Sequence, residues 1–238
     1  AEAARATLAV TREYHRTRVN LDVTVDGDAL VFAGTPAPDR VISDAQGRER
    51  LPGTRVRSED DPPSADAAVN QAFDGLGETF AFFWDAFSRA GVDGAGGTLE
   101  ATVHYGEKYD NAFWNGERMV FGDGDGEVFT GFTGSLSVIA HELGHGVVEA
   151  GGGLEYQGQS GALNESVADV FGALTEQHAQ GQTAGEASWL IGAGIFTEAV
   201  QGVALRSMKA PGTAYDDDVL GRDPQPAHMR DYVETTED

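Results

Sequence analysis

The sequence contains no cysteine. This absence excludes disulfides and thiol nucleophiles, and it leaves histidines and carboxylates as the strong ligands for any metal ion. Basic residues are also scarce: 16 Lys and Arg residues stand against 39 Asp and Glu residues, for a formal net charge of −23. Because such a charge repels phosphate backbones and anionic lipids, we expect no nucleic-acid partner and no membrane partner. No apolar run approaches the roughly 20 residues needed to cross a bilayer.

The remaining composition is that of an ordinary globular protein, with 238 residues of which 40% are hydrophobic. This length suits one large domain or two lobes that share a cleft. The acidity suits either a generic acidic surface or salt tolerance and the retention of divalent cations. We divide the chain into residues 1–40, residues 41–136, which are rich in strands and carry one long helix, and residues 137–238, which are mostly helical. The expected fold class is α+β.

The first 40 residues are expected to form a separate module. Residues 1–17 have a helical pattern, and residues 21–32 alternate around an Asp-Gly-Asp turn, which predicts a hairpin. The segment 34–38, with two prolines, is expected to be an exposed linker.

Residues 41–136 are expected to alternate between strands and one long helix. Residues 41–57 are strand-like, and two prolines before Ser64 indicate a helix with Ser64 as its N-cap. Further strands are expected at residues 98–104 and 119–121. The Gly-Asp run at 122–126 lacks the ligand spacing of an EF-hand and is interpreted as a turn. Large apolar side chains at helical spacing are expected in the core: Phe73, Leu76, Phe80, Phe83, Trp84 and Phe87.

From residue 137 the pattern predicts three helices, at residues 137–149, 162–178 and 184–196. The first contains His141, Glu142 and His145, the pattern H-E-x-x-H. Two imidazoles four residues apart lie on one helix face and can reach one ion, while the glutamate between them projects beside it as a base. A single histidine in such a helix is more often a core residue, but burying three polar groups without partners costs several kcal/mol. The pattern therefore favours a zinc site.

A catalytic zinc ion takes three protein ligands and leaves a fourth position for water. A metzincin would place its third histidine at residue 151, which is a glycine here, so that class is excluded. Glu165 is the better candidate, at the start of the second predicted helix. Asp169 lies one turn further on the same face, where it can accept the N–H of a ligating imidazole.

Five segments together resemble the thermolysin-like metallopeptidase family, and within it the protealysin-like branch. They are NAFWNG (111–116), FGDGDG (121–126), HELGH (141–145), GALNES (161–166) and ALRSM (204–208). The resemblance covers residues 40–238. It implies a thermolysin-like mixed β/α lobe leading into central zinc-binding helices, with one catalytic Zn²⁺ and a peptide or protein substrate.

The resemblance also implies roles for individual residues. His141, His145 and Glu165 would be the zinc ligands, Glu142 the general base and Asp169 the partner of His141. Tyr156 would help to hold the oxyanion. Asn111, the Ala112 carbonyl and the adjacent Trp114 fall in the segment that grips the substrate backbone, and Arg206 lies beside the pocket that follows the scissile bond. The apolar lining of that pocket would be Phe129, Phe132, Val138 and Leu205.

The chain also departs from the family pattern. Family members continue past the position of Asp238 into a helical lobe that supplies a transition-state histidine, so we expect that lobe to be absent here, with a second chain as a candidate source. Ser137 stands where many relatives have a calcium-binding aspartate, and Glu176 alone remains of their acidic cluster. At most one Ca²⁺ is therefore expected. Residues 1–40 would be the tail of a propeptide; the alternative is an integral N-terminal hairpin.

These observations predict a zinc-dependent neutral endopeptidase that cuts on the N-terminal side of bulky hydrophobic residues, here as a precursor or a truncated form. The alternative is a non-catalytic fragment that binds zinc and peptide without turnover. Glu142 argues against the alternative, because a structural zinc site gains nothing from an extra carboxylate beside an open position. Secretion is expected, with a cytoplasmic location as the alternative.

Overall fold

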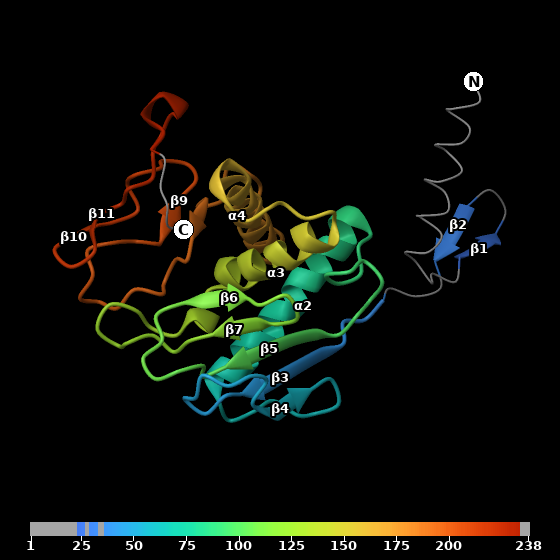
Figure 1. Ribbon diagram of the computed structural model, residues 1–238. Helices are drawn as coiled ribbons and strands as arrows, with labels where there is room; N and C mark the ends of the chain where they lie inside the picture. The colour runs from blue at the N-terminus through green and yellow to red at the C-terminus, as the bar shows by residue number, and fades with distance from the viewer. Residues whose placement is uncertain (1–22, 27–28, 33–35, 234–238) are drawn as a thin grey trace, which may run out of the picture.

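The computed structural model describes residues 23–26, 29–32 and 36–233 (Figure 1). Its first elements are β1 (Val23–Asp26) and β2 (Ala29–Phe32), which pair as an antiparallel hairpin with Val23 opposite Phe32. The predicted hairpin is therefore confirmed. The helix predicted at residues 1–17 lies outside the described residues.

A five-stranded mixed sheet follows, with the strand order β4-β3-β5-β7-β6. β3 and β5 are parallel, as are β5 and β7, while the two edge strands β4 and β6 run antiparallel to their neighbours. Because β6 is an edge strand, its outer backbone groups have no strand partner in this sheet. The strand bounds are β3 (Arg40–Asp44), β4 (Thr54–Ser58), β5 (Leu99–Val103), β6 (Ala112–Trp114) and β7 (Met119–Phe121).

The long helix α2 (Ala67–Phe87) begins at Asp66, whose side chain accepts hydrogen bonds from the N–H groups of Ala68 and Val69. The predicted N-cap, Ser64, is wrong. Its hydroxyl instead accepts the N–H of Asp66, so it stabilises the turn that leads into the helix. The helix ends at Ser88, which has a left-handed backbone conformation.

The predicted aromatic core is largely confirmed. Phe73, Leu76, Phe80 and Phe83 of α2 are buried against the sheet and against α3. Trp84 is only partly buried and packs against the same core, and Phe87 has 55% of its surface exposed. Phe87 is the last residue of the helix, and its ring packs edge-on against the rings of Phe82 and Phe171. It stays exposed because the chain leaves the helix at this point.

Two helices follow (Figure 1): α3 (Leu136–Ala150), which comes after the short 3-10 turn η1 (Phe132–Gly134), and α4 (Gly158–Gln180). α3 packs against α2 and the edge strand β6, and α4 packs against α3 and α2. Both were predicted. Glycines permit their close approach: a Cβ on Gly144 would lie 3.2 Å from the Cα of Ala168, and one on Gly172 would lie 2.5 Å from the Ser137 carbonyl oxygen. One face of α3 is thereby held against the middle turns of α4.

The predicted third helix, at residues 184–196, is wrong. Residues 190–191 form a short strand, and Gly192 and Gly194 have φ angles of +73° and +81°, which are incompatible with a helix. The apolar spacing that suggested a helix reflects the burial of Ile191 and Ile195 in an irregular segment. The short elements after α4 are β8 (Leu190–Ile191), β9 (Arg206–Ser207), β10 (Asp216–Asp217), β11 (Gly221–Arg222) and η2 (Met229–Asp231).

The Gly-Asp run at residues 122–126 forms the predicted turn. Asp125 accepts the backbone N–H groups of Glu127, Val128 and Phe129 at 2.8–3.1 Å, so its carboxylate serves the turn itself. Among the helices in the described part of the chain, none combines the length and the apolar character that a membrane span requires.

Candidate metal centre

His141 and His145 lie one turn apart on α3, and both rings face α4. Their Nε2 atoms are 3.0 Å apart. Glu165, in the second turn of α4, places Oε2 3.3 Å from Nε2 of His141 and Oε1 3.4 Å from Nε2 of His145. The predicted three ligands therefore converge on one point, where the close packing of α3 and α4 brings the two helices together.

Hydrogen bonds at the far side of each ring determine which nitrogen faces this point. His141 Nδ1 lies 2.8 Å from Oδ1 of Asp169, and His145 Nδ1 lies 2.8 Å from Oδ1 of Asn164. Because both partners are acceptors, each Nδ1 carries a proton, and each neutral ring presents the lone pair of Nε2. Two lone pairs and a carboxylate in contact repel one another unless they share a cation or a proton.

The donor set fits zinc. Ligand atoms about 2.0–2.2 Å from a tetrahedral zinc ion lie about 3.3–3.5 Å from one another, close to the separations of 3.0, 3.3 and 3.4 Å found here. Two imidazoles and one carboxylate also leave a fourth position for water. Over the described residues, no other group of three His, Cys, Asp or Glu side chains is close enough to hold a metal ion.

The charges around the three ligands favour a positive species at their centre. Burial lowers the pKa of His141, but the hydrogen bonds to Asp169 and Glu165 outweigh it and raise that pKa to about 9. Burial raises the pKa of Glu165, while His141 and the Tyr156 hydroxyl hold it near 2. A bound cation would take the place of the proton that the raised pKa retains on His141.

Asp169 connects the metal centre to β9. Its carboxylate accepts two hydrogen bonds from Arg206, at 2.8 Å from Nε and 2.7 Å from Nη2, in addition to its bond with His141. Although burial opposes ionisation, these partners lower the pKa of Asp169 to about 2. Arg206 thus holds in place the carboxylate of Asp169, which orients His141.

Glu142 lies beside the two histidines on α3 and is 7% exposed. Burial raises the pKa of its carboxyl, and the nearby imidazoles of His141 and His145 oppose that rise. The backbone N–H of Trp114 donates a hydrogen bond to it. A buried carboxylate with a raised pKa, next to a metal site, has the character of a proton acceptor for water.

Tyr156 lies at the entrance to the centre and is 48% exposed. Its hydroxyl donates a hydrogen bond to Oε1 of Glu165, and its ring lies 5.9 Å from that of His145 in an edge-on arrangement. In this structure the hydroxyl therefore contacts a ligand carboxylate.

The predicted backbone-binding segment is the edge strand β6. Asn111 precedes it and accepts the N–H of Ala112 at 2.9 Å. The indole of Trp114 points away from these two residues: its Nε1 donates to Glu149 at 2.8 Å, and its ring lies over Gly146.

The four predicted apolar lining residues pack together beside the first turn of α3. Phe132 and Val138 are buried, and Phe129 and Leu205 pack against the same core. The rings of Phe129 and Phe132 are 5.5 Å apart, and Phe196 lies at the same distance on the other side of Phe129. Phe196 was not predicted in this cluster, because the segment that carries it was expected to be helical.

Asn164 was also missed. It orients His145 as Asp169 orients His141, and the available signal was its place directly before Glu165 at the start of the same helix. At the position considered for calcium, Ser137 is fully buried, and its hydroxyl is engaged with Ser135 and with the N–H of Gly192. Glu176 accepts a hydrogen bond from Gln180. The calcium expectation remains a prediction.

Comparison with known proteins supports the resemblance. Residues 9–149 match the family described as thermolysin metallopeptidase, catalytic domain, and residues 152–238 match that described as thermolysin metallopeptidase, alpha-helical domain. An extracellular metalloprotease of Pectobacterium carotovorum subsp. carotovorum is 54% identical over 200 residues, which are 84% of this chain and 58% of that protein. A bacillolysin of Bacillus cereus is 45% identical over 83% of this chain and 35% of its own length.

A solved structure is also similar: the precursor of protealysin, a metalloproteinase from Serratia proteamaculans, has a TM-score of 0.82 and 50% identity, over 92% of this chain and 65% of that one. The chain thus spans about a third to two thirds of the length of these relatives.

The prediction that the C-terminal helical lobe is absent is wrong in part, because residues 152–238 match the alpha-helical domain. α4, which carries Glu165, lies within this matched domain and not only in the central zinc-binding region. The chain belongs to the thermolysin metallopeptidase family.

Proposed function

We propose that this protein is a zinc-dependent neutral endopeptidase. The observation that carries the proposal is the convergence of two imidazole Nε2 atoms and the Glu165 carboxylate within 3.0–3.4 Å of one another, with buried Glu142 beside them. The names of two of the relatives quoted above support it, since one is called a metalloprotease and the other a metalloproteinase. His141, His145 and Glu165 would hold the ion.

Zinc at this site would lower the pKa of a bound water to about 7 and polarise the peptide carbonyl. With the ion in place, Glu142 would accept the proton of the attacking water and pass it to the nitrogen of the leaving amine. Asp169 and Asn164 keep the two imidazoles in the Nδ1–H tautomer throughout. Tyr156 stabilises the negative charge that develops on the carbonyl oxygen.

We infer that the substrate binds in an extended conformation along β6. The outer edge of this strand is unpaired in the sheet, so its backbone, beginning with the Ala112 carbonyl, can pair with a peptide. Asn111 and Trp114, at either end, would help to position it. The cluster of Phe129, Phe132, Val138 and Leu205 would favour bulky hydrophobic residues directly after the scissile bond, with Arg206 beside it.

Three further features belong to the same proposal. We infer that residues 1–40 act as the tail of a propeptide, which agrees with the precursor state of the similar solved structure. Secretion agrees with the extracellular relatives. We also infer that the transition-state histidine, which in the family lies past the position of Asp238, is supplied from beyond the matched region, on this or on a second polypeptide.

The test is hydrolysis of an internally quenched peptide with a bulky hydrophobic residue after the scissile bond. Stoichiometric zinc and turnover that a chelator removes are expected. Glu142→Gln should abolish turnover and retain zinc, whereas Glu155→Gln, a nearby exposed glutamate, should retain both. If the protein binds zinc but shows no hydrolysis that depends on Glu142, it is instead a non-catalytic protein that binds zinc and peptide.

A further inference from the structure

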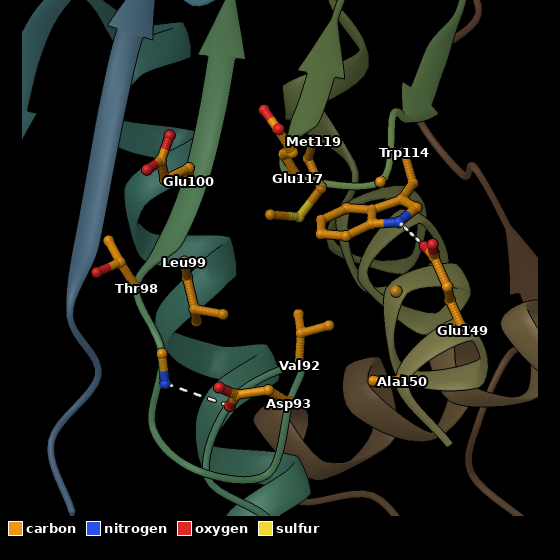
Figure 2. A pocket seen from close by; sticks show the side chains of 13 residues that line it. Val92, Asp93, Thr98, Leu99, Glu100, Trp114, Glu117, Met119, Glu149 and Ala150 are labelled. Atoms are coloured by element: carbon orange, nitrogen blue, oxygen red, sulfur yellow. Dashed lines mark hydrogen bonds between the residues drawn. The ribbon is translucent and has the colours of Figure 1, made fainter. Parts of the chain in front are cut away.

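A second cavity, of about 350 Å³, lies at the C-terminal end of α3 (Figure 2). Its walls come from the start of β5, the turn between β6 and β7, the loop after α2, and the last turns of α3. Its volume is at the lower end of the range for ligand pockets, about 300–1,000 Å³. Of the residues in the proposed catalytic site, it shares only Trp114.

The cavity lies beside the catalytic site, along one face of α3. Glu142, Gly146 and Glu149 are spaced at i, i+4 and i+7, so they share a stripe of the helix that begins at the proposed base. Trp114 spans that stripe: its backbone N–H bonds to Glu142, its ring covers Gly146, and its indole N–H donates to Glu149. The cavity therefore lies on the same helix face as the proposed base, one to two turns further along α3.

Its position relative to the metal centre indicates which part of a substrate it would meet. Val138, in the apolar pocket proposed for the residue after the scissile bond, lies before the two histidines on α3, and Glu149 lies after them. Glu149 is about 6 Å along the helix from His145, and an extended peptide advances about 3.3 Å per residue. The cavity would thus face a side chain two or three residues before the scissile bond.

The lining combines an apolar interior with an acidic rim. The side chains of Val92, Leu99, Met119 and Trp114 point toward the centre in Figure 2, while carboxylates lie around the edge. The four acidic residues of the lining are Asp93, Glu100, Glu117 and Glu149, and no basic residue is among the thirteen described residues that line the cavity.

The carboxylates differ in how they are engaged. Glu100 is paired with Arg118, Glu149 accepts from Trp114, and Asp93 accepts two backbone N–H groups of its own loop. The carboxylate of Glu117 is exposed and has no hydrogen bond or ion pair with another described residue, whereas its backbone N–H donates to Oδ1 of Asn115. Two arginines lie beside this lining: Arg118 pairs with Glu100, and Arg89 donates to the carbonyl oxygen of Val92. Four acids against two arginines leave the rim negatively charged.

An apolar interior with a negative rim matches a side chain with a long aliphatic stem and a terminal cation. Lysine and arginine have this chemistry, and the face of the Trp114 indole adds a cation–π surface. We propose that this cavity is a second specificity pocket that binds a Lys or Arg side chain of the peptide substrate, two or three residues before the scissile bond. This inference rests on the proposed endopeptidase function.

Peptides that are identical after the scissile bond test the proposal, with Lys, norleucine or Glu placed two or three residues before it. We expect kcat/KM for the better Lys peptide to exceed that for its norleucine analogue by about three- to tenfold, mainly through KM, and the Glu peptide to be the poorest. In a Glu117→Gln, Glu149→Gln double variant the ratio of kcat/KM for the Lys peptide to that for the norleucine peptide should fall to about twofold or less. Glu78→Gln, an exposed change on α2, is the matched control.

A binding measurement separates this proposal from the proposed function. Nα-acetyl-lysine amide and Nα-acetyl-norleucine amide are titrated into the full chain, and the indole N–H resonance of Trp114 is followed by NMR. Tighter binding of the lysine probe supports the cavity's selectivity, even if the protein shows no turnover. Absence of turnover would count only against the endopeptidase function. Equal binding of both probes, or equal kcat/KM for Lys and norleucine in an active enzyme, would overturn the pocket proposal and leave the function intact.

Discussion

Asp169 lies directly behind His141, with its Oδ1 2.8 Å from the ring Nδ1. The carboxylate fixes the tautomer and the orientation of the imidazole, so that Nε2 points at the proposed metal position. Nε and Nη2 of Arg206 both donate to the same carboxylate, and these two bonds fix the orientation of Asp169. The metal centre is therefore supported by the segment after α4 as well as by the two helices that supply its ligands.

Asp169→Asn should lower the affinity for zinc by about 10- to 100-fold, because the neutral amide loses the charge-assisted bonds to the imidazole and the guanidinium. Competition with a chromophoric chelator measures the change. Asp218→Asn removes an exposed aspartate elsewhere and should leave the affinity unaltered. An Asp169→Asn affinity within twofold of the wild type would contradict the support assigned to this carboxylate.

Tyr156→Phe should lower kcat by about 100-fold and leave KM and zinc affinity close to their original values, if the hydroxyl stabilises the developing oxyanion. The competing role is visible in the structure, where the hydroxyl donates to Glu165. Kinetics of the zinc-loaded variant together with zinc titration separate the two roles. Weakened zinc binding with an unchanged kcat would assign the hydroxyl to supporting the ligand, and Tyr232→Phe provides an exposed control.

The sequence predicted the metal centre well because its geometry is mostly helical. Spacing of four residues places His141 with His145, and Glu165 with Asp169, on shared helix faces whatever the tertiary fold. The pairing of Asn164 with His145 depends instead on how closely α4 approaches α3, and no local pattern specifies that distance. It is determined by glycine contacts between the helices.

The difference between local spacing and tertiary contacts also explains why the helix predicted at residues 184–196 does not form. The apolar spacing around Ile191 and Ile195 is real and corresponds to burial. Two glycines with positive φ angles interrupt it, and the short strand pair with β9 replaces the helix. Periodicity identified the buried residues there, but the backbone conformation depends on a strand that comes fifteen residues later in the chain.

Gly172→Ala should destabilise the protein despite the higher helix propensity of alanine, which favours it by about 1 kcal/mol. The new Cβ would lie 2.5 Å from the Ser137 carbonyl oxygen, a backbone atom that cannot move aside alone. A net loss of about 1–3 kcal/mol is expected from this overpacking. Urea denaturation measures it. Gly134→Ala, whose Cβ would meet no atom within 4 Å, should change stability by less than about 0.5 kcal/mol.

His104 forms the other strongly perturbed histidine site, away from the metal centre. Its Nε2 lies 2.9 Å from Asp66, the N-cap of α2, and its Nδ1 lies 2.8 Å from Asp123 in the Gly-Asp turn. The hydrogen bond to Asp123 is the main cause that raises the pKa of His104 from 6.5 to about 9; burial opposes the rise, and Asp66 adds to it. The protonated ring thus links the start of the long helix to the turn before η1.

A folded-state pKa above the unfolded value means that this stabilisation is fully present below pH 6.5 and is lost as the pH rises through about 9. We expect a contribution on the order of 1–2 kcal/mol after solvent screening of the half-exposed carboxylates. His104→Asn suits the test because asparagine tolerates the left-handed backbone at this position, where φ is 54°. The free energy of unfolding should therefore differ between wild type and variant at pH 6 and converge above pH 9.5, whereas His228→Asn should follow the wild type throughout. An equal difference at both pH values would mean that packing, rather than charge, accounts for the role of His104.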